Sequence, residues 1–225
     1  HLSATPPPAD SLNAVVHAAC LTARHAQPGW AATILSARLE ILARTRALIA
    51  THAEHLATAS AFARQRPMAE SLTADVVPLA DACRFIEREA ARLLAPRQLG
   101  RRGRPLWLGG VRTEIHRDPL GVVLIIAPAN YPLFLPGVQI LQALATGNAV
   151  LIKPGHHGTA AAQTLVNLLH HAGLDHRLAQ ILPESTAAAQ LAIAAGVAKV
   201  FLTGSAATGA AVLADFSRSC AAGAG

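Results

Sequence analysis

The stretch from Pro119 to Ile152 contains no charged residue, and this run constrains the fold more than any other part of the sequence. A membrane-spanning helix needs about 20 apolar residues, but Pro128, Pro132 and Pro136 would each interrupt such a helix. Parallel strands that are covered on both faces have the same continuous apolar composition. The run therefore predicts two buried parallel strands with a helix between them, and argues against a membrane span.

Strand and helix patterns alternate through the second half of the sequence. The predicted strands are residues 122–127, 148–152, 180–182 and 199–203, and the predicted helices are residues 133–146, 159–172, 186–195 and 206–216. Four such alternations are typical of a doubly wound, mostly parallel α/β sheet. We therefore assign the chain to the α/β class.

The first half has a helical pattern followed by a loop. Apolar residues recur at helical spacing from Trp30 through Ile34 to Ile49, directly after Pro28. Further helices are predicted over residues 54–64 and 69–94, the second kinked at its internal proline. Its expected core residues are Val76, Val77, Leu79, Cys83, Phe85 and Ile86.

A loop and a possible arm follow these helices. Residues 97–110 carry four glycines and a proline, which is typical of a loop or linker. Residues 111–116 then alternate apolar and polar side chains, which predicts an exposed strand or one arm of a hairpin.

The charge balance bears on possible partners. The formal net charge is +6, and almost all of the basic residues are arginines. A basic chain can bind nucleic acid, but the arginines are scattered except for Arg101, Arg102 and Arg104. We therefore expect no nucleic-acid partner, although the positive field would attract a phosphate-bearing ligand.

The cysteines and histidines point away from a disulfide framework and from a metal site. Cys20, Cys83 and Cys220 are few and far apart, which predicts a reducing compartment, the cytoplasm. The pairs 156–157 and 170–171 are histidines, but no cysteine or carboxylate stands at metal-ligand spacing beside them. We therefore expect no metal.

Ligands of an open parallel sheet bind beyond the carboxyl ends of its strands, and three predicted turns there carry polar groups. Asn130 follows the first strand, and its amide could stabilise an oxyanion or serve only the turn. Lys153 follows the second strand, where it could bind a ribose or phosphate, or extend to solvent from the surface. Gly204 and Ser205 follow the fourth strand, at a helix start that suits a phosphate or a plain N-cap serine.

Taken together, the three turns resemble a known family. Their sequences are A-P-A-N-Y-P at 127–132, G-N-A-V-L-I-K-P at 147–154 and K-V-F-L-T-G-S-A-A-T-G at 199–209. In order and spacing they resemble the NAD(P)-dependent aldehyde dehydrogenase superfamily, and the resemblance covers most of the chain. It implies NAD or NADP as the cofactor, an aldehyde as the substrate and a homo-oligomer for the intact protein.

The resemblance also implies a role for each matched residue. Asn130 would help to hold the oxyanion of a cysteine thiohemiacetal, and Lys153 would contact the adenosine ribose. Residues 111–118 would form a strand of an oligomerisation arm. The positions beside the nicotinamide and its ribose would be Ala127, Pro128 and Ala129. The turn against the pyrophosphate would comprise Gly204, Ser205, Thr208 and Gly209.

Two positions depart from the family pattern. Ala129 stands where the family often has tryptophan, which changes one wall of the pocket. His156 stands where the family often has a glutamate that binds the adenosine ribose hydroxyls. Since a carboxylate repels a 2′-phosphate and a histidine does not, we expect NADP to be tolerated at least as well as in the glutamate-bearing members.

The resemblance places the rest of the catalytic machinery beyond Gly225. Cys220 follows the phosphate turn too soon to match the family's nucleophilic cysteine, and the family's activating glutamate would also come later. The sequence thus predicts the cofactor-binding part of an aldehyde-oxidising enzyme, inactive alone and without its catalytic domain. Residues 1–110 would be a helical segment packing on a truncated dinucleotide-binding domain at 119–225.

Two other functions stay open at this stage. One is a non-catalytic dinucleotide-binding or subunit-interaction module that ends near residue 225. The other is a basic nucleic-acid-binding protein, which would need its arginines gathered on one face.

Overall fold

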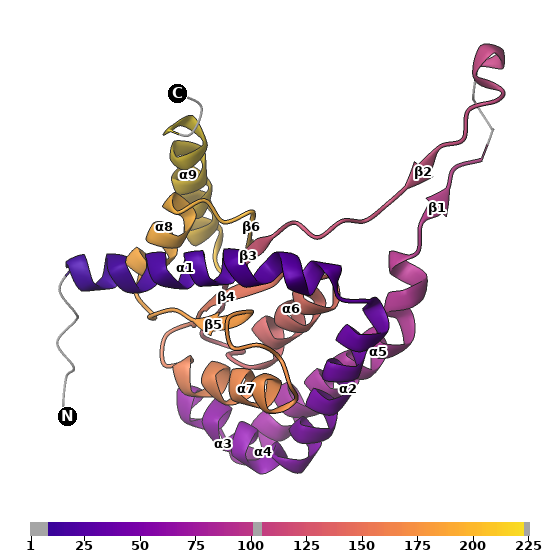
Figure 1. Ribbon diagram of the computed structural model, residues 1–225. Helices are drawn as coiled ribbons and strands as arrows, with labels where there is room; N and C mark the ends of the chain where they lie inside the picture. Colours follow the sequence, from indigo (N-terminus) through magenta and orange to yellow (C-terminus); the bar gives the residue numbers. More distant parts are fainter. Residues whose placement is uncertain (1–8, 101–104, 223–225) are drawn as a thin grey trace.

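The computed structural model describes residues 9–100 and 105–222 (Figure 1). The N-terminal part comprises α1 (Ala9–Ala32), α2 (Leu35–Thr51), α3 (Ala53–Arg64), α4 (Met68–Ser71), the π-helical turn η1 (Leu72–Val76) and α5 (Val77–Leu94). The short strands β1 (Arg97–Gln98) and β2 (Glu114–Ile115) follow, with the 3-10 turn η2 (Leu106–Leu108) between them. The remaining elements are β3 (Val122–Ile126), α6 (Phe134–Ala145), β4 (Ala149–Lys153), α7 (Thr159–His171), β5 (Ala179–Ile181), α8 (Thr186–Ala194), β6 (Lys199–Leu202) and α9 (Ala206–Ala222).

The sheet is parallel and has the strand order β5-β4-β3-β6. The α/β fold class expected from the sequence is therefore confirmed. From β3 the chain moves outward to β4 and β5, and then returns to place β6 on the other side of β3. This reversal puts the topological switch point, where ligands of such sheets bind, between β3 and β6. β3 is buried along its whole length, as the charge-free sequence run predicts.

Helices cover both faces of the sheet. α1 and α8 pack on one face, and α6 and α7 pack on the other. α2, α3 and α5 in turn pack against α6 and α7 and form a further layer (Figure 1). One apolar core runs through all of these layers, so the helical segment and the sheet are packed as one body.

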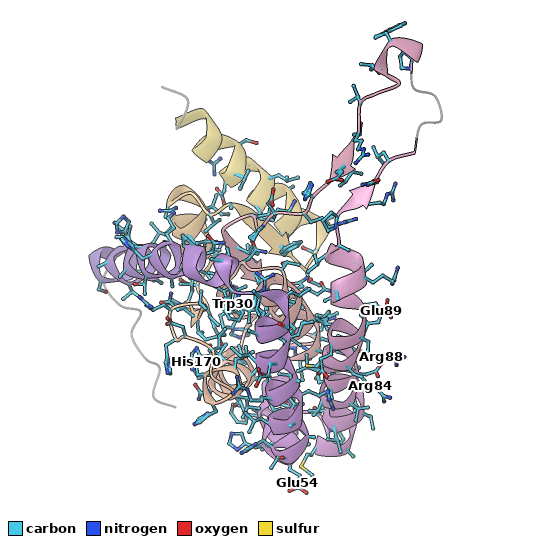
Figure 2. The ribbon with its side chains drawn as sticks, turned by 45° about the vertical axis from the view of Figure 1, so that its right-hand side comes forward. Trp30, Glu54, Arg84, Arg88, Glu89 and His170 are labelled. Carbon is cyan, nitrogen blue, oxygen red and sulfur yellow. The ribbon has the colours of Figure 1, made fainter. Side chains whose placement is uncertain are left out.

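Side chains of α1 anchor it to helix ends on both faces of the sheet. Arg24, Gln27 and Trp30 each donate a hydrogen bond to a backbone carbonyl at or just after the end of α8 or α6. The acceptors are the carbonyl oxygens of Gly196, Gly147 and Leu144, at 2.8, 2.9 and 2.9 Å in that order. The last carbonyls of a helix lack the regular partner of the helix interior, so α1 adds hydrogen bonds where the backbone ladders of α6 and α8 end. Figure 2 shows Trp30 near the end of α1.

Arginines gather at the ends of the sheet helices. α6, α7 and α8 are each followed by a glycine with positive φ, a conformation that favours glycine. Beside each glycine lies an arginine from α1 or α2, and the pairs are Gly147 with Arg38, Gly173 with Arg44, and Gly196 with Arg24. A cation is favourable there because the carboxyl end of a helix carries partial negative charge. The amino edge of the sheet therefore holds cations from the N-terminal helices.

Asn148 joins the start of β3 to the end of α6. Its Oδ1 accepts from the backbone N–H groups of Leu120 and Gly121, at 2.6 and 3.0 Å. Its Nδ2 donates to the Ala143 carbonyl and to Thr146 Oγ1, at 3.2 and 2.8 Å. Asn148 is buried, and these four hydrogen bonds satisfy a polar group that would otherwise be costly inside the core.

The first helix extends further than the sequence pattern predicts. Pro28 lies inside α1 rather than ahead of a helix that begins at Trp30. The break comes at Thr33 and Ile34, and the Ile34 side chain is 69% exposed instead of contributing to the core. The ring of Pro28 lies on the exposed side of α1, so the packing of the opposite face on the sheet outweighs the lost N–H.

The predicted kink near Pro78 takes the form of the π-helical turn η1, which ends one residue before α5 begins. In this region Val76, Leu79, Cys83 and Ile86 are buried, as predicted. Val77 and Phe85 were expected in the core but are 57% and 55% exposed. The buried residues are three or four apart and form one stripe, whereas the two exposed residues lie outside it. The labelled Arg84, Arg88 and Glu89 point outward from α5 in Figure 2.

The residues after α5 form a two-stranded arm that projects from the body (Figure 1). β1 pairs with β2 in antiparallel fashion, with Arg97 opposite Ile115. The exposed strand expected near residues 111–116 is therefore present, but its partner strand lies in the segment predicted to be only a loop. The Arg101, Arg102 and Arg104 cluster lies outside the described residues. None of the helices in residues 9–100 and 105–222 combines the length and apolar character needed to cross a membrane.

Replacing Asn148 by alanine should destabilise the fold by about 3 kcal/mol, because four backbone and side-chain groups lose a buried partner. Urea unfolding followed by circular dichroism measures this change. Asn167→Ala on the exposed face of α7 is the matched control, and we expect it to change stability by less than about 0.5 kcal/mol. Equal effects of the two substitutions would contradict the role given to Asn148.

Candidate functional site

The carboxyl edge of the sheet brings together four turns, one after each strand. Three of them are the turns that the sequence singles out, after β3, β4 and β6. The fourth, residues 183–185 after β5, was overlooked. Backbone hydrogen bonds join neighbouring turns, since Ala127 N donates to the Lys153 carbonyl at 3.0 Å and Thr203 N donates to the Ile126 carbonyl at 3.3 Å.

The turn after β3 presents Asn130 at the edge. Ala127 and Pro128 are buried, Ala129 is half-buried and Asn130 is exposed. Arg66 comes from the segment after α3 and donates from Nη2 to the Asn130 carbonyl at 2.8 Å. The same guanidinium lies over the ring of Tyr131, with Cζ 5.0 Å from the ring centroid. Arg66 thus fixes the backbone of this turn and leaves the Asn130 side chain at the surface.

The turns after β3 and β4 touch through Gly155. A Cβ added there would lie 2.4 Å from the Pro128 carbonyl oxygen and 2.7 Å from the Ala129 nitrogen. Real Cβ atoms do not approach backbone so closely, so only glycine fits this position without a shift of one turn. The close approach holds the Asn130 and Lys153 turns in a fixed relation.

The turns after β4 and β5 are joined by Glu184. Its Oε1 accepts from Thr159 N at 3.0 Å and from Thr159 Oγ1 at 2.6 Å. Its Oε2 accepts from His157 N at 3.0 Å and lies 4.0 Å from His156 Nδ1. Glu184 therefore binds the start of α7.

Burial and hydrogen bonding act in opposite directions on the charges in this part of the edge. Burial works to raise the pKa of Glu184, but the hydrogen bonds from Thr159 and His157 outweigh it and hold the pKa below its ordinary value. Burial lowers the pKa of the Lys153 ammonium, and the nearby Glu184 carboxylate opposes that shift. The turns after β4 and β5 thus contribute a partly desolvated cation, Lys153, and an anion, Glu184, whose charges influence each other.

The turn after β6 opens α9. Ser205 Oγ accepts from Thr208 N at 3.2 Å and lies 2.9 Å from Thr208 Oγ1. Ser205 is therefore an N-cap, which was the plainer interpretation of this serine. The turn is also tied to α6, because Gln139 Nε2 donates to Thr203 Oγ1 at 3.1 Å.

Neither the glycine of this turn, Gly204, nor Gly209 near the start of α9 is required by the chain itself. Neither Gly204 nor Gly209 has a positive φ. An added Cβ would come no closer than 3.5 Å to Leu202 from Gly204, and 3.7 Å from Gly209. Neither the backbone conformation nor the packing requires glycine at these two positions, so glycine leaves open a cradle that a Cβ would fill. Such a cradle fits a phosphate that approaches the start of a helix.

The four helix starts at this edge differ in the charge of the side chain that binds their N–H groups. The carboxylate of Asp75 accepts from Phe134 N at the start of α6, at 3.0 Å, and Glu184 binds the start of α7. The starts of α8 and α9 are capped by the neutral hydroxyls of Ser185 and Ser205. Of these two, α9 follows β6, beside the topological switch point. A helix start attracts anions, so the α9 start is the place on this edge best suited to a phosphate.

The described cysteines are structural rather than reactive. Cys20 in α1 and Cys83 in α5 are buried and free. Burial raises the pKa of the Cys20 thiol, and raises that of Cys83 to about 12. Cys220 lies on α9, and its side chain is outside the described residues. Among residues 9–100 and 105–222, no group of three or more His, Cys, Asp or Glu side chains could hold a metal ion.

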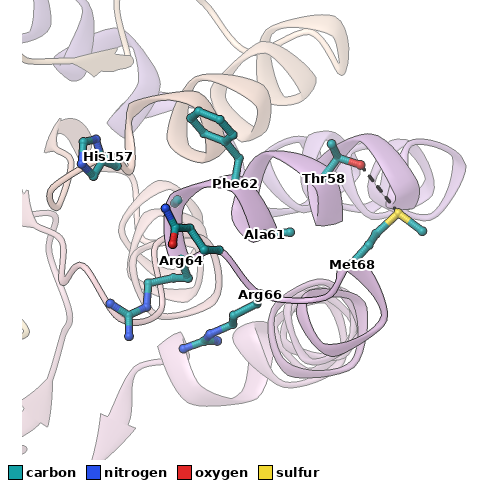
Figure 3. A pocket seen from close by; sticks show the side chains of 9 residues that line it. Thr58, Ala61, Phe62, Arg64, Arg66, Met68 and His157 are labelled. Carbon is teal, nitrogen blue, oxygen red and sulfur yellow. Dashed lines mark hydrogen bonds between the residues drawn. The ribbon is translucent and has the colours of Figure 1, made fainter. Parts of the chain in front are cut away.

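A cavity of about 860 Å³ lies beside the second turn (Figure 3). Its lining comes mainly from the end of α3 and the residues after it, together with His157. Phe62 and Met68 give it an apolar wall, and Arg64 and Arg66 line it with positive charge. The lining includes none of the residues predicted for the cofactor, but two of its members contact predicted residues. The ring of His157 lies 3.7 Å from that of His156, centroid to centroid, and Arg66 donates to the backbone carbonyl of Asn130.

A match to a known protein family shows to which family this chain belongs. The model of the aldehyde dehydrogenase family matches residues 8–222, nearly the whole chain. This chain belongs to the aldehyde dehydrogenase family.

Curated relatives of this aldehyde dehydrogenase family member agree with the match. A betaine aldehyde dehydrogenase of Cereibacter sphaeroides is 36% identical over 87% of this chain and 39% of its own length. An N-succinylglutamate 5-semialdehyde dehydrogenase of Novosphingobium aromaticivorans is 31% identical over 84% of this chain and 39% of its own length. The chain spans 36% to 40% of the length of such relatives.

A solved structure has the same fold. The NADP-dependent glyceraldehyde-3-phosphate dehydrogenase of Bacillus halodurans, complexed with NADP, superposes with a TM-score of 0.82 at 26% identity. The superposition covers 90% of this chain and 43% of that protein.

Sequence reasoning missed four residues that build the edge, namely Arg66, Asp75, Gly155 and Glu184. A signal existed for Glu184, because a carboxylate directly after a predicted strand lies at the carboxyl edge of the sheet. Gly155 also stands in a strand-to-helix turn. Arg66 and Asp75 carried no such signal, since they come from the distant helical segment.

Replacing Gly155 by alanine should destabilise the fold by about 2–3 kcal/mol, because the new methyl group overlaps the backbone of the first turn. Gly204→Ala is the matched substitution at the open turn, and we expect it to change stability by less than about 0.5 kcal/mol. Thermal and urea unfolding measure both. A stable Gly155→Ala variant would show that the two turns are not held together as described.

The contribution of Glu184 to stability should depend on pH. Because its pKa is lower in the folded chain, the carboxylate stabilises the fold above about pH 4.3, the ordinary value for glutamate. That contribution is lost as the pH falls through the folded-state pKa. Urea unfolding of the wild type and Glu184→Gln at several pH values between 7 and 3 measures it. The difference between the two proteins should shrink toward pH 3, and a constant difference would contradict the assignment.

Proposed function

We propose that this chain is the cofactor-binding part of an NAD(P)+-dependent aldehyde dehydrogenase, which oxidises an aldehyde to a carboxylic acid through a cysteine thiohemiacetal. The observation that carries the proposal is the turn at Gly204 and Ser205. It lies beside the switch point, it opens a helix with a neutral cap, and its glycines leave a cradle for a phosphate.

The dinucleotide would lie along the carboxyl edge. Its pyrophosphate would meet the start of α9, at Gly204, Ser205, Thr208 and Gly209. The nicotinamide and its ribose would lie beside the buried turn at residues 127–129, and the adenosine ribose beside Lys153 and His156. The contacts through Gly155 and Glu184 support this arrangement, because they fix the turns relative to one another before any ligand arrives.

Asn130 would act on the substrate. Its exposed side-chain amide can donate to an oxygen that becomes negative when a nucleophile adds to the aldehyde. Arg66 would hold the amide in position through the Asn130 carbonyl, without touching the substrate. The bound dinucleotide would supply the hydride acceptor. The attacking cysteine and the glutamate that activates water would lie beyond residue 225, so these residues alone would not catalyse the reaction.

The remaining features fit this assignment. We propose residues 1–110 as the helical segment, 111–118 as an oligomerisation arm and 119–225 as the dinucleotide-binding domain. The arm formed by β1 and β2 projects from the body (Figure 1), which supports a homo-oligomer for the intact protein. The two buried free cysteines fit the cytoplasm, a reducing compartment. The relatives include dehydrogenases of betaine aldehyde and of a succinylated semialdehyde, so for this protein we propose only the class of aldehydes.

The chain should bind NAD, and Gly204→Ala should weaken that binding about tenfold, a loss of roughly 1.4 kcal/mol. The physical reason is that a methyl group would fill the cradle for the pyrophosphate while leaving the fold intact. Isothermal titration calorimetry of the 225-residue chain with NAD measures the effect.

Gly29→Ala is the control for this titration, because an added Cβ at Gly29 on α1 has no atom within 4 Å. Its affinity for NAD should equal that of the wild type. If the folded wild-type chain binds no NAD, or if both alanine variants bind as tightly as the wild type, the pyrophosphate site proposed at α9 is wrong.

A further inference from the structure

Glu184 occupies a place that phosphates ordinarily take. The N–H groups at a helix start form a ready anion site, and at α7 the Glu184 carboxylate already binds the first helical N–H and the N–H that precedes the N-cap. One oxygen accepts from Thr159 N and Oγ1, and the other from His157 N. An incoming phosphate would have to displace a negative group that belongs to the chain.

The Glu184 carboxylate is nevertheless within reach of a ligand. Its side chain is 30% exposed, and the exposed imidazole of His156 lies 4.0 Å from Oε2. Lys153, at the end of β4, is close enough to interact with the same carboxylate. The proposed site of the adenosine ribose therefore has an anion near its cation, contributed by the turn that follows the neighbouring strand β5.

The Glu184 carboxylate changes the expectation, drawn from His156 alone, that NADP is well tolerated. A histidine at position 156 removes one source of repulsion for a 2′-phosphate. Glu184 restores a negative charge within 4.0 Å of that histidine. A ribose 2′-hydroxyl can donate a hydrogen bond to a carboxylate, whereas a 2′-phosphate near neutral pH is an anion that the carboxylate repels.

We propose that Glu184 is a specificity-determining residue that makes this chain select NAD over NADP. The proposal rests on the function proposed above, because it takes the adenosine ribose to lie beside Lys153 and His156. Glu184 would act twice, by filling the anion site at the start of α7 and by repelling a second phosphate on the ribose.

The test compares both dinucleotides on the wild-type chain and on Glu184→Gln by isothermal titration calorimetry. Glutamine keeps the size of the side chain and one accepting oxygen, but it removes the charge. We expect the wild type to prefer NAD by about 30-fold or more and the variant by less than about 5-fold. Most of this change should come from tighter NADP binding.

Glu54→Gln is the matched control, because Glu54 is an exposed carboxylate in the first turn of α3, another helix start. Figure 2 shows it at the far end of the helical layer. This substitution makes the same change in net charge, so it should leave the preference for NAD unaltered. An equal change in preference in both variants would mean that net charge alone sets it, and would overturn the proposal.

A second measurement covers the case in which Glu184→Gln does not fold. In the wild type, salt screens the repulsion between Glu184 and a 2′-phosphate. Raising KCl from about 0.05 to 0.5 M should therefore increase the affinity for NADP relative to NAD. If the basic chain merely attracted the additional phosphate, the same salt would decrease that ratio, and the proposal would be overturned.

The other outcomes are also decisive. If Glu184→Gln weakens NAD and NADP binding by the same factor and lowers the melting temperature, Glu184 only caps α7, and its assignment to specificity is wrong. Wild-type binding of NADP as tight as that of NAD overturns the inference but leaves the proposed function standing. If the folded chain binds neither dinucleotide, the proposed function itself fails.

Discussion

The fold depends on how the chain satisfies the ends of its sheet helices. At the amino edge, side chains of α1 donate to the last carbonyls of α6 and α8, and arginines of α1 and α2 lie beside the glycines that end α6, α7 and α8. At the carboxyl edge, Asp75 and Glu184 bind the starts of α6 and α7. The arginines, Asp75 and Glu184 match the partial charge of a helix end with a side chain of opposite sign, and Gln27 and Trp30 add neutral hydrogen bonds. The helical segment is thus held to the sheet by polar groups as well as by the apolar core.

The distribution of charged and neutral side chains over the helix ends also determines where an anionic ligand can bind. Two helix starts at the carboxyl edge are already neutralised by carboxylates, and the two that remain are capped by serines. Of those, only the α9 start adjoins the switch point and has glycines that the chain itself does not need. Cations at the amino edge serve structure, so the overall positive charge of the chain is a poor guide to its site. The local arrangement of the helix ends is a better guide to the binding site.

The sequence predicts the sheet part well because its signals are local. Continuous apolar runs identify β3 and β4, and glycines mark the ends of α7 and α8. It fails where packing between distant segments decides the outcome. Pro28 lies within α1 because that helix packs on the sheet, and Val77 and Phe85 are exposed because the core selects only one stripe of α5. In the site, too, local signals predict better than distant contacts. Asn130, Lys153 and Ser205 lie at the expected edge of the sheet. Arg66 and Asp75 also contact this edge, but they come from segments far away in the sequence and were not predicted.

The central claim is that a dinucleotide binds along the carboxyl edge, with its pyrophosphate at the start of α9. Backbone amide chemical shifts of the isotopically labelled chain, recorded by NMR during a titration with NAD, test it most directly. We expect shifts concentrated in residues 127–130, 153–159 and 203–209, with those of the amides at the start of α9 among the largest. Shifts confined to the amino edge, or to the cavity beside α3, would contradict it.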